Sequence, residues 1–100
     1  MNNLEHTFTT ALLEQLGKAA GVCGVEEVRL RQQAEALGGV KAVKQMLARR
    51  QENRQFVPLK NMKRLDLSVE ALVVKGKFAS LFTDEEVNAC LDALLEGGLY

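Results

Sequence analysis

Residues 4–20 read LEHTFTTALLEQLGKAA, and apolar side chains recur in this stretch at every third or fourth position. The repeat consists of Leu4, Phe8, Leu12, Leu16, Ala19 and Ala20. A period of about 3.6 residues is typical of an amphipathic α-helix that buries one side. The stretch therefore predicts a helix over 4–20 that ends at the glycine-containing segment 21–24. Its broad apolar arc favours a central place in a helical bundle.

The same period continues into two further helices. Glu26 and Glu27 are expected in the first turn of a second helix, where carboxylates oppose the positive end of the helix dipole. The apolar positions of this helix are Val28, Leu30, Ala34 and Leu37. Gly38-Gly39 is expected to end it, and a third helix follows over 40–50. The apolar side of the third helix consists of Val40, Val43, Met46 and Leu47.

Residues 51–60 lose the period and contain the only proline of the chain. They are predicted to form a long connection or an extended segment that wraps the bundle, followed by a short helical piece at about 59–65. Ser68 then offers an N-cap for another helix, which Gly76 weakens or ends. The apolar side of that helix consists of Val69, Leu72 and Val73, and the expected core anchors after it are Phe78, Leu81 and Phe82.

The last helix has the clearest start, because Thr83 and Glu86 have the spacing of a capping box. Its expected buried stripe consists of Val87, Cys90, Leu91 and Leu94, before Gly97-Gly98 ends it. The sequence thus predicts an all-α fold, a compact single-domain bundle of five to six short helices over 1–100 without a significant sheet. This domain divides into an N-terminal helical pair at 1–37 and a second part at 38–100.

The length of 100 residues allows one domain and excludes a two-domain enzyme or a long repeat array. A hydrophobic fraction of 47% is enough for a core. No window provides the roughly 18 uninterrupted apolar residues of a membrane-spanning helix. Because a signal peptide is not recognisable either, we expect a cytoplasmic location without membrane contact. Cys23 and Cys90 are expected to be free thiols in that compartment.

Catalytic and metal-binding motifs are scarce. His6 is the only histidine and lies close to the N-terminus, so a nucleophile paired with histidine is not expected. Two cysteines and one histidine are too few for a structural zinc site. The acidic clusters at 26–27 and 84–86 are explained by their places at helix N-termini. The prediction is a protein that is not an enzyme, with no cofactor and no bound metal.

The net charge of zero is a sum of opposed blocks. Residues 1–39 carry three basic and five acidic residues (−2), residues 40–80 carry ten basic and three acidic (+7), and residues 81–100 carry five acidic (−5). If the central cations converge on one face, they attract phosphates or an acidic protein surface. Otherwise they form a solvated face or pair with the acidic last helix. The candidate contact residues are Lys41, Lys44, Arg49, Arg50, Arg54, Lys60, Lys63 and Arg64.

Two blocks of the sequence resemble a short module of uncharacterised bacterial proteins. They are RLDLS-x-EALV at 64–73 and LFT-x-EE at 81–86, within a resemblance that covers about residues 38–98. The module has no established activity, so the resemblance implies a bacterial or mobile-element origin and no mechanism. The chain departs from the module at 75–77, where Lys-Gly-Lys replaces the more usual acidic or proline-containing turn, and the helix boundary there stays open.

These observations favour a non-enzymatic bacterial or mobile-element accessory protein. It is expected to bind a macromolecular partner, above all a protein, through its basic central segment or an apolar helix face. One alternative is a phage-type inhibitor of a nucleic-acid-processing defence complex, similar to anti-CRISPR proteins in its size and its missing catalytic motifs. Another is direct nucleic-acid binding through the central cations. A homodimer that completes the apolar arc of the first helix also stays open.

Overall fold

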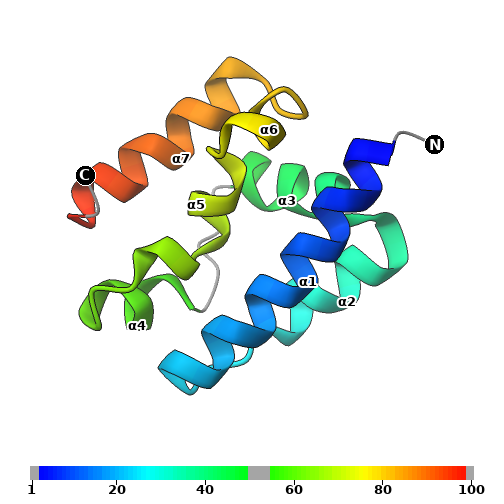
Figure 1. Ribbon diagram of the computed structural model, residues 1–100. Coiled ribbons are helices and arrows are strands. Elements are labelled where there is room, and N and C mark those ends of the chain that lie inside the picture. Colours follow the sequence, from blue (N-terminus) through cyan, green and yellow to red (C-terminus); the bar gives the residue numbers. More distant parts are fainter. Residues whose placement is uncertain (1–2, 50–54, 99–100) are drawn as a thin grey trace.

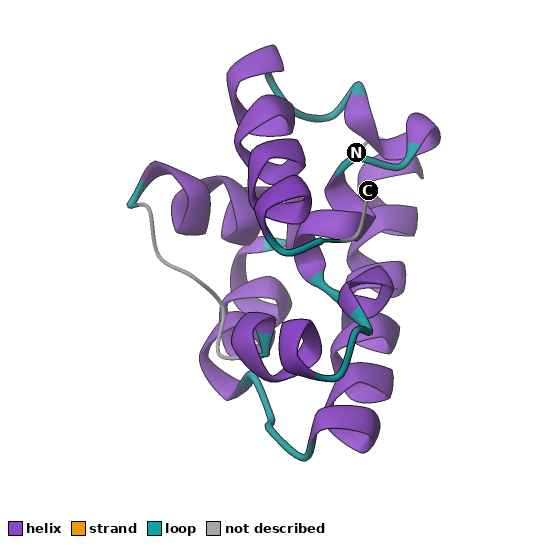
Figure 2. Cartoon of the chain, turned by 90° about the vertical axis from the view of Figure 1, so that its left-hand side faces the viewer, coloured by secondary structure: helices purple, strands orange, loops and turns teal. Residues whose placement is uncertain are grey.

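Helices make up nearly all of the chain that the computed structural model describes, which is residues 3–49 and 55–98 (Figure 1). In chain order they are α1 (Asn3–Cys23), α2 (Val28–Leu37), α3 (Gly39–Ala48), α4 (Phe56–Asn61), the 3₁₀-helix η1 (Leu65–Leu67), α5 (Val69–Val73), α6 (Gly76–Ala79) and α7 (Asp84–Glu96). Within these residues there is no strand, and short loops join the helices (Figure 2). The predicted all-α class is confirmed, although the described residues form seven α-helices rather than five to six. None of these helices has both the length and the apolar character needed to cross a membrane.

α1 contributes to both parts of the core. Phe8, Leu12 and Leu16 are buried in the larger apolar cluster, whereas Ala19 belongs to the smaller one. The larger cluster also contains side chains of α2, α3, α5, α6 and α7. The smaller cluster contains side chains of α4, η1, α5 and α7. Because so many elements cover one side of α1, the apolar repeat at 4–20 is stable as a helix.

α5 lies between the two clusters. All five of its residues are buried, with Ala71 in the smaller cluster and the other apolar ones in the larger. Ser68 caps α5 as predicted, since its Oγ accepts a hydrogen bond from the Ala71 N–H at 3.2 Å. A helix of five residues is not stable alone in water. α5 therefore depends on the neighbours that bury it.

An aromatic contact joins α1 to the segment around α6. The ring of Phe8 meets the rings of Phe78 and Phe82 edge to face, with centroids 5.1 Å and 5.3 Å apart. This arrangement places the positive edge of one ring against the negative face of another. Phe78 and Phe82 are therefore core anchors, as the sequence predicts, and Leu81 packs half-buried against the same cluster.

The boundaries of the first three helices differ from the sequence predictions. α1 continues through Cys23, and the chain leaves the helix at Gly24, whose φ of 74° is left-handed. Glu27 is the N-cap of α2 rather than a first-turn residue, and its carboxylate accepts a hydrogen bond from a backbone N–H of the first turn. α3 begins at Gly39 and ends at Ala48.

The prediction of an irregular connection over 51–60 is wrong from Phe56 onward, where α4 begins. Residues 51–54 lie outside the described part of the chain. Pro58 is the third residue of α4, and backbone N–H groups of a first helical turn have no acceptor within the helix. The proline therefore removes no helical hydrogen bond. Two short elements, α4 and η1, stand where one helical piece at about 59–65 is expected.

Gln55 holds the start of α4 against the end of α1. Its side chain is buried, and its Nε2 donates hydrogen bonds to the backbone oxygens of Leu16 at 3.1 Å and Val25 at 2.8 Å. Leu16 lies in α1, and Val25 lies in the loop that follows it. One amide group thus joins three segments of the chain.

α7 begins as predicted. The Thr83 Oγ1 accepts a hydrogen bond from the Glu86 N–H at 3.2 Å, and the Glu86 Oε1 accepts one from the Thr83 N–H at 2.8 Å. This completes the capping box. Cys90 and Leu94 are buried along the expected stripe, and Val87 packs half-buried against the larger cluster.

Gly76 has a different role from the one predicted. α5 ends before it, at Val73, and Gly76 is the first residue of α6. The Lys-Gly-Lys segment at 75–77 thus coincides with the start of a separate one-turn helix.

Gly39 allows α3 to approach α1 closely. A Cβ atom at this position would lie 2.9 Å from the Thr9 Cα and 3.2 Å from the Leu12 Cδ2. The Thr9 Cα is backbone and cannot rotate away. The Gly39 N–H also donates a hydrogen bond to the Thr9 Oγ1 at 2.8 Å. Glycine is therefore required here because a Cβ atom has no room between α1 and α3, and not because the backbone has a positive φ.

Replacing Gly39 by Ala is expected to lower the free energy of unfolding by about 1–3 kcal/mol, because the added methyl group forces α1 and α3 apart. Gly76→Ala is the matched control, since nothing lies within 4 Å of a Cβ there. Its effect is expected to stay within about 0.5 kcal/mol. Urea unfolding followed by circular dichroism measures both variants, and equal stabilities would contradict the close approach of the two helices.

Candidate partner-binding groove

The structure divides the predicted cations between α3 and the region of α4. Lys41 and Lys44 lie in α3, and Arg49 is its exposed C-cap. Those on and just after α4 are Lys60, Lys63 and Arg64, all exposed. Those outside the described residues are Arg50 and Arg54. Figure 1 shows α3 and α4 apart, with α5 between them, so the described candidates do not form one site.

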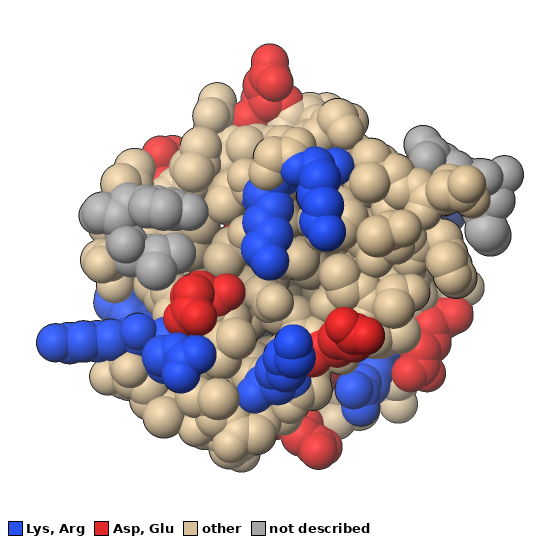
Figure 3. Space-filling view, viewed as in Figure 1, with Lys and Arg blue, Asp and Glu red and all other residues tan. Residues whose placement is uncertain are grey.

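Acidic side chains interrupt the cations on the molecular surface. On the face drawn in Figure 3, Lys and Arg side chains form small separate groups with Asp and Glu between several of them. Arg64 also has an acidic neighbour, because its Nε lies 3.2 Å from the Asp66 Oδ1 in an exposed ion pair. The positive middle block of the sequence therefore does not become one continuous positive patch on this face.

Lys44 is engaged within the protein. Its Nζ lies 2.9 Å from the Glu86 Oε1 and 5.5 Å from the centroid of the Phe82 ring. The ion pair joins α3 to the first turn of α7, which is the predicted pairing of a central cation with the acidic last helix. Lys41 is exposed and forms no ion pair within the described part of the chain.

A single glycine connects α2 to α3. Gly38 is both the C-cap of α2 and the N-cap of α3, with φ 90° and ψ 150°. Its N–H donates to the Ala34 oxygen at 2.9 Å and so completes the last turn of α2. A side chain with a Cβ rarely adopts this φ, whereas glycine does so without strain. The two helices therefore meet in a tight corner.

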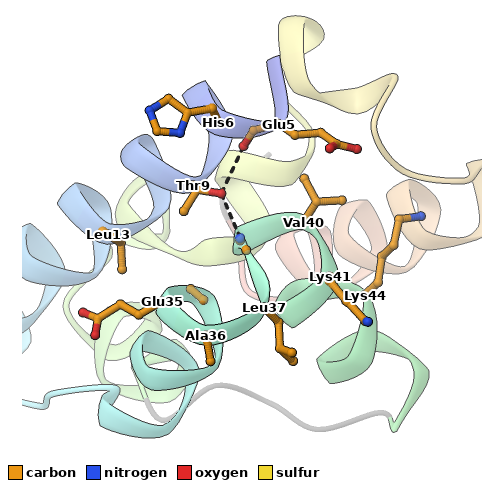
Figure 4. Close-up of a pocket in the computed structure, with 13 residues that line it drawn as sticks. Glu5, His6, Thr9, Leu13, Glu35, Ala36, Leu37, Val40, Lys41 and Lys44 are labelled. Atoms are coloured by element: carbon orange, nitrogen blue, oxygen red, sulfur yellow. Dashed lines mark hydrogen bonds between the residues drawn. The ribbon is translucent and has the colours of Figure 1, made fainter. Parts of the chain in front are cut away.

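α1 passes over this corner and is tied to it by Thr9. The Thr9 Oγ1 accepts the hydrogen bond from the Gly39 N–H and donates its own proton to the Glu5 backbone oxygen at 3.0 Å (Figure 4). The hydroxyl thus uses its donor and an acceptor position to hold α3 against α1. Together with the close packing at Gly39, this fixes the corner relative to α1.

A groove lies between α1 and the corner. It has a volume of about 800 Å³, which is within the usual range for binding pockets. The first half of α1, the end of α2 and the start of α3 form its walls. The described residues that line it are Glu5, His6, Thr9, Leu13, Ala34, Glu35, Ala36, Leu37, Gly38, Gly39, Val40, Lys41 and Lys44. About half of these residues are exposed, so the groove is open to solvent.

The groove combines an apolar middle with charged ends. Leu37 is 44% exposed, and Leu13 and Val40 are half-buried where they pack against the core. Figure 4 shows Leu37 between Glu35 at one end and Lys41 at the other. The start of α3, the positive end of its helix dipole, lies on the same side as Lys41. The groove can therefore bind an apolar group and orient charged groups on either side of it.

Sequence reasoning missed the central residue of the groove. The helical period groups Leu37 with Leu30 and Ala34, which are buried, but Leu37 itself is exposed. Val28 is exposed as well, and it lies on the other side of α2 from Leu30 because two residues correspond to just over half a helical turn. One signal was present: Leu37 directly precedes two glycines, where a helix ends and its last turn has fewer neighbours to cover it.

The polar side chains among the described lining residues of the groove include one hydroxyl, one imidazole and two carboxylates. The one hydroxyl among its described lining residues, that of Thr9, holds the corner, and neither cysteine lines it. His6 is exposed at its rim. Within the described residues, no three His, Cys, Asp or Glu side chains are grouped so as to hold a metal ion.

No protein family, curated protein or solved structure gives a significant match to the chain.

Glu86 links the capping box of α7 to Lys44. Burial by itself raises the pKa of Glu86, but the hydrogen bonds from Lys44 and Thr83 and the charge of Lys44 outweigh it, so the pKa lies below its ordinary value. A carboxyl with a lower pKa in the folded state stabilises the fold at pH values above its unfolded-state pKa. This stabilisation is lost as the pH falls through the folded-state pKa.

Glu86→Gln is expected to lower the free energy of unfolding at neutral pH by on the order of 0.5 kcal/mol, because it removes the charge that pairs with Lys44. Glutamine retains a capping-box acceptor, so the variant tests the charge alone. The difference from the unmodified protein is expected to shrink as the pH falls from neutral through the lowered pKa of Glu86, because the carboxyl then becomes protonated. Glu85→Gln, an exposed neighbour in the same helical turn, is the control. Urea unfolding across this pH range measures the effect, and a constant difference would contradict the assignment.

The two free cysteines differ in accessibility. Cys90 is fully covered, and burial, followed by the charges of Glu70 and Glu86, raises the pKa of its thiol to about 12. Cys23 is half-buried near the end of α1, where its Sγ donates to the Val25 oxygen at 3.7 Å. A thiol reacts as the thiolate, so Cys90 is protected by both its pKa and its burial.

A thiol reagent at neutral pH is expected to modify Cys23 in the native protein and to modify Cys90 only after denaturation. Mass spectrometry of the labelled peptides identifies the site. A Cys23→Ser variant is then expected to stay unlabelled while it is folded. Rapid labelling of Cys90 in the folded protein would show that α7 opens more readily than its packing indicates.

Proposed function

We propose that the protein is a non-enzymatic accessory protein that binds a segment of a partner protein in the groove. The observation that supports this most is the exposed Leu37 on a corner that Gly38 and Thr9 hold in place. An apolar side chain that is already fixed loses little conformational freedom when it is covered. A preorganised apolar surface of this kind is suited to binding.

An amphipathic polypeptide segment fits the groove better than a small molecule does. Sites for small molecules enclose most of the ligand and place several polar groups around it. Here the groove is open, and its middle offers apolar contacts from Leu37, Leu13 and Val40. Lys41 favours an acidic group of the partner at one end, and Glu35 favours a basic group at the other. A partner helix can place its apolar side over Leu37 and can carry an acidic group next to Lys41 and a basic group next to Glu35.

The setting that we propose is the cytoplasm of a bacterium, with the gene on the chromosome or on a mobile element. Two free thiols suit a reducing compartment, and the origin rests on the resemblance over residues 38–98. The division of the central cations between α3 and α4 gives less support to direct nucleic-acid binding, which depends on several phosphate contacts made together.

Leu37→Glu is expected to weaken binding of the partner at least about tenfold, because it places a charge where the apolar side of the partner packs. Leu95→Glu is the matched control, since Leu95 is equally exposed but lies on α7 outside the groove. Tagged forms of the protein, crosslinked in the source cells and analysed by quantitative mass spectrometry, measure how much partner each variant retains. Circular dichroism checks that both variants are folded.

The expected result is one protein that the unmodified chain and Leu95→Glu retain in stoichiometric amount and that Leu37→Glu loses. Equal retention by Leu37→Glu would exclude the groove as the binding site. Recovery of nucleic acid in place of a protein would favour the alternative of direct nucleic-acid binding.

A further inference from the structure

A second surface lies towards the other end of α1 from the groove. The groove uses the first half of α1, whereas α4 packs in the smaller cluster with Ala19, near the end of α1. Phe56 and Leu59 are the buried residues of α4 in that cluster. The exposed apolar and basic side chains at 57–64 are here named the α4 surface, which consists of Val57, Lys60, Met62, Lys63 and Arg64.

The α4 surface leaves two large apolar side chains uncovered. Val57 is 50% exposed and Met62 is 49% exposed. They are two of the five exposed large apolar residues in the described part of the chain, and they lie on or next to a helix of only six residues. Single exposed apolar residues are common, whereas here two fall within six consecutive residues, 57–62.

The charge of the α4 surface is positive and mostly unopposed. Lys60, Lys63 and Arg64 are exposed within one short stretch. Only Arg64 has an ion pair, with the exposed carboxylate of Asp66. In the described chain, no carboxylate lies within ion-pair distance of Lys60 or Lys63. The surface therefore presents two unpaired ammonium groups next to two apolar side chains.

Lys63 occupies a position where glycine would be more stable. Its N–H donates to the Lys60 oxygen at 3.1 Å, and the Arg64 N–H donates to the Leu59 oxygen at 2.8 Å. This is the hydrogen-bond pattern of a Schellman motif, which usually has glycine at the left-handed position. Lys63 has a φ of 58° and is the one non-glycine residue with positive φ that the structure describes. The chain thus keeps a lysine here at some cost in stability.

We propose that the α4 surface binds an acidic polypeptide segment of a partner protein, one that also carries apolar side chains. Carboxylates complement the ammonium groups of Lys60 and Lys63, and apolar side chains of the segment cover Val57 and Met62. A nucleic-acid backbone matches the charges but offers nothing comparable to the two apolar residues. The α4 surface shares no residue with the groove, so the experiments on it test this proposal independently of the function proposed for Leu37.

The probe is a short fluorescent peptide of alternating Glu and Leu residues, titrated against the full chain and followed by fluorescence anisotropy at low and physiological salt. The double variant Lys60→Glu with Lys63→Glu is expected to weaken binding at least about tenfold, because two attractive charges become repulsive. Lys75→Glu with Lys77→Glu is the matched control, since these lysines are also exposed but belong to the region of α6, away from α4 in Figure 1. The control is expected to bind the peptide like the unmodified protein.

Lys63→Gly separates binding from stability. Glycine adopts the left-handed conformation without strain, so the thermal unfolding midpoint is expected to rise. Binding of the acidic peptide is expected to weaken several-fold in the same variant, because one of the two unpaired charges is gone. A loss of binding in a more stable protein cannot be attributed to unfolding.

Three results would overturn the proposal. The first is that the peptide does not bind even at low salt, or that a peptide with Lys in place of Glu binds equally well. The second is that Lys63→Gly binds the acidic peptide as tightly as the unmodified protein. The third is that a DNA duplex binds more tightly than the peptide and competes with it, in which case the surface is a nucleic-acid contact.

Discussion

The burial of one side of α1 is the constraint on which the other helices depend. Phe8, Leu12 and Leu16 face the larger cluster and Ala19 faces the smaller, so a single helix supports both parts of the core. α4, α5 and α6 are too short to be stable alone. They form because α1, together with α3 and α7, provides an apolar surface on which each of them loses solvent exposure. A change that moves α1 therefore alters the packing of every other helix and the position of both candidate binding surfaces.

The position of the groove follows from the way in which α3 is held against α1. Gly39 removes the side chain that would keep the helices apart, and Thr9 closes the contact with a hydrogen bond. Gly38 has a separate role, because its positive φ lets α2 end and α3 begin with one residue between them. At this tight corner Leu37 is the last residue of α2, and it is left 44% exposed at the side of the groove. Two adjacent glycines, required for different physical reasons, thus determine where an apolar residue stays available to a partner.

Features that depend on neighbours in the chain could be predicted from the sequence, and features that depend on distant contacts could not. The caps at Ser68 and Thr83 are local hydrogen bonds, and both are present. The prediction at Pro58 fails because the effect of a proline depends on where the helix begins. The start of α4 is held in place by the buried amide of Gln55, which donates hydrogen bonds to α1 and to the loop after it. Leu37 has the correct period for burial, but burial needs a neighbouring element that covers it, and periodicity carries no information about such an element. The candidate cations could be identified by composition, whereas their division between α3 and α4 is a consequence of tertiary packing.

Part of the positive excess of the middle block is compensated within the fold, because Lys44 pairs with Glu86 of the acidic last helix. Arg64 is paired with Asp66, a carboxylate of the middle block itself. The compensation is incomplete at the α4 surface, where Lys60 and Lys63 lie beside exposed apolar side chains. Thr9, which lines the groove, and Ala19, which packs with α4, are ten positions apart on α1, or about 15 Å along the helix axis. A single partner chain can therefore contact both the groove and the α4 surface only if it spans that distance. Because Leu37 and the residues of the α4 surface are exposed, substitutions at these positions leave the core packing unchanged, and their contributions to binding can be measured separately.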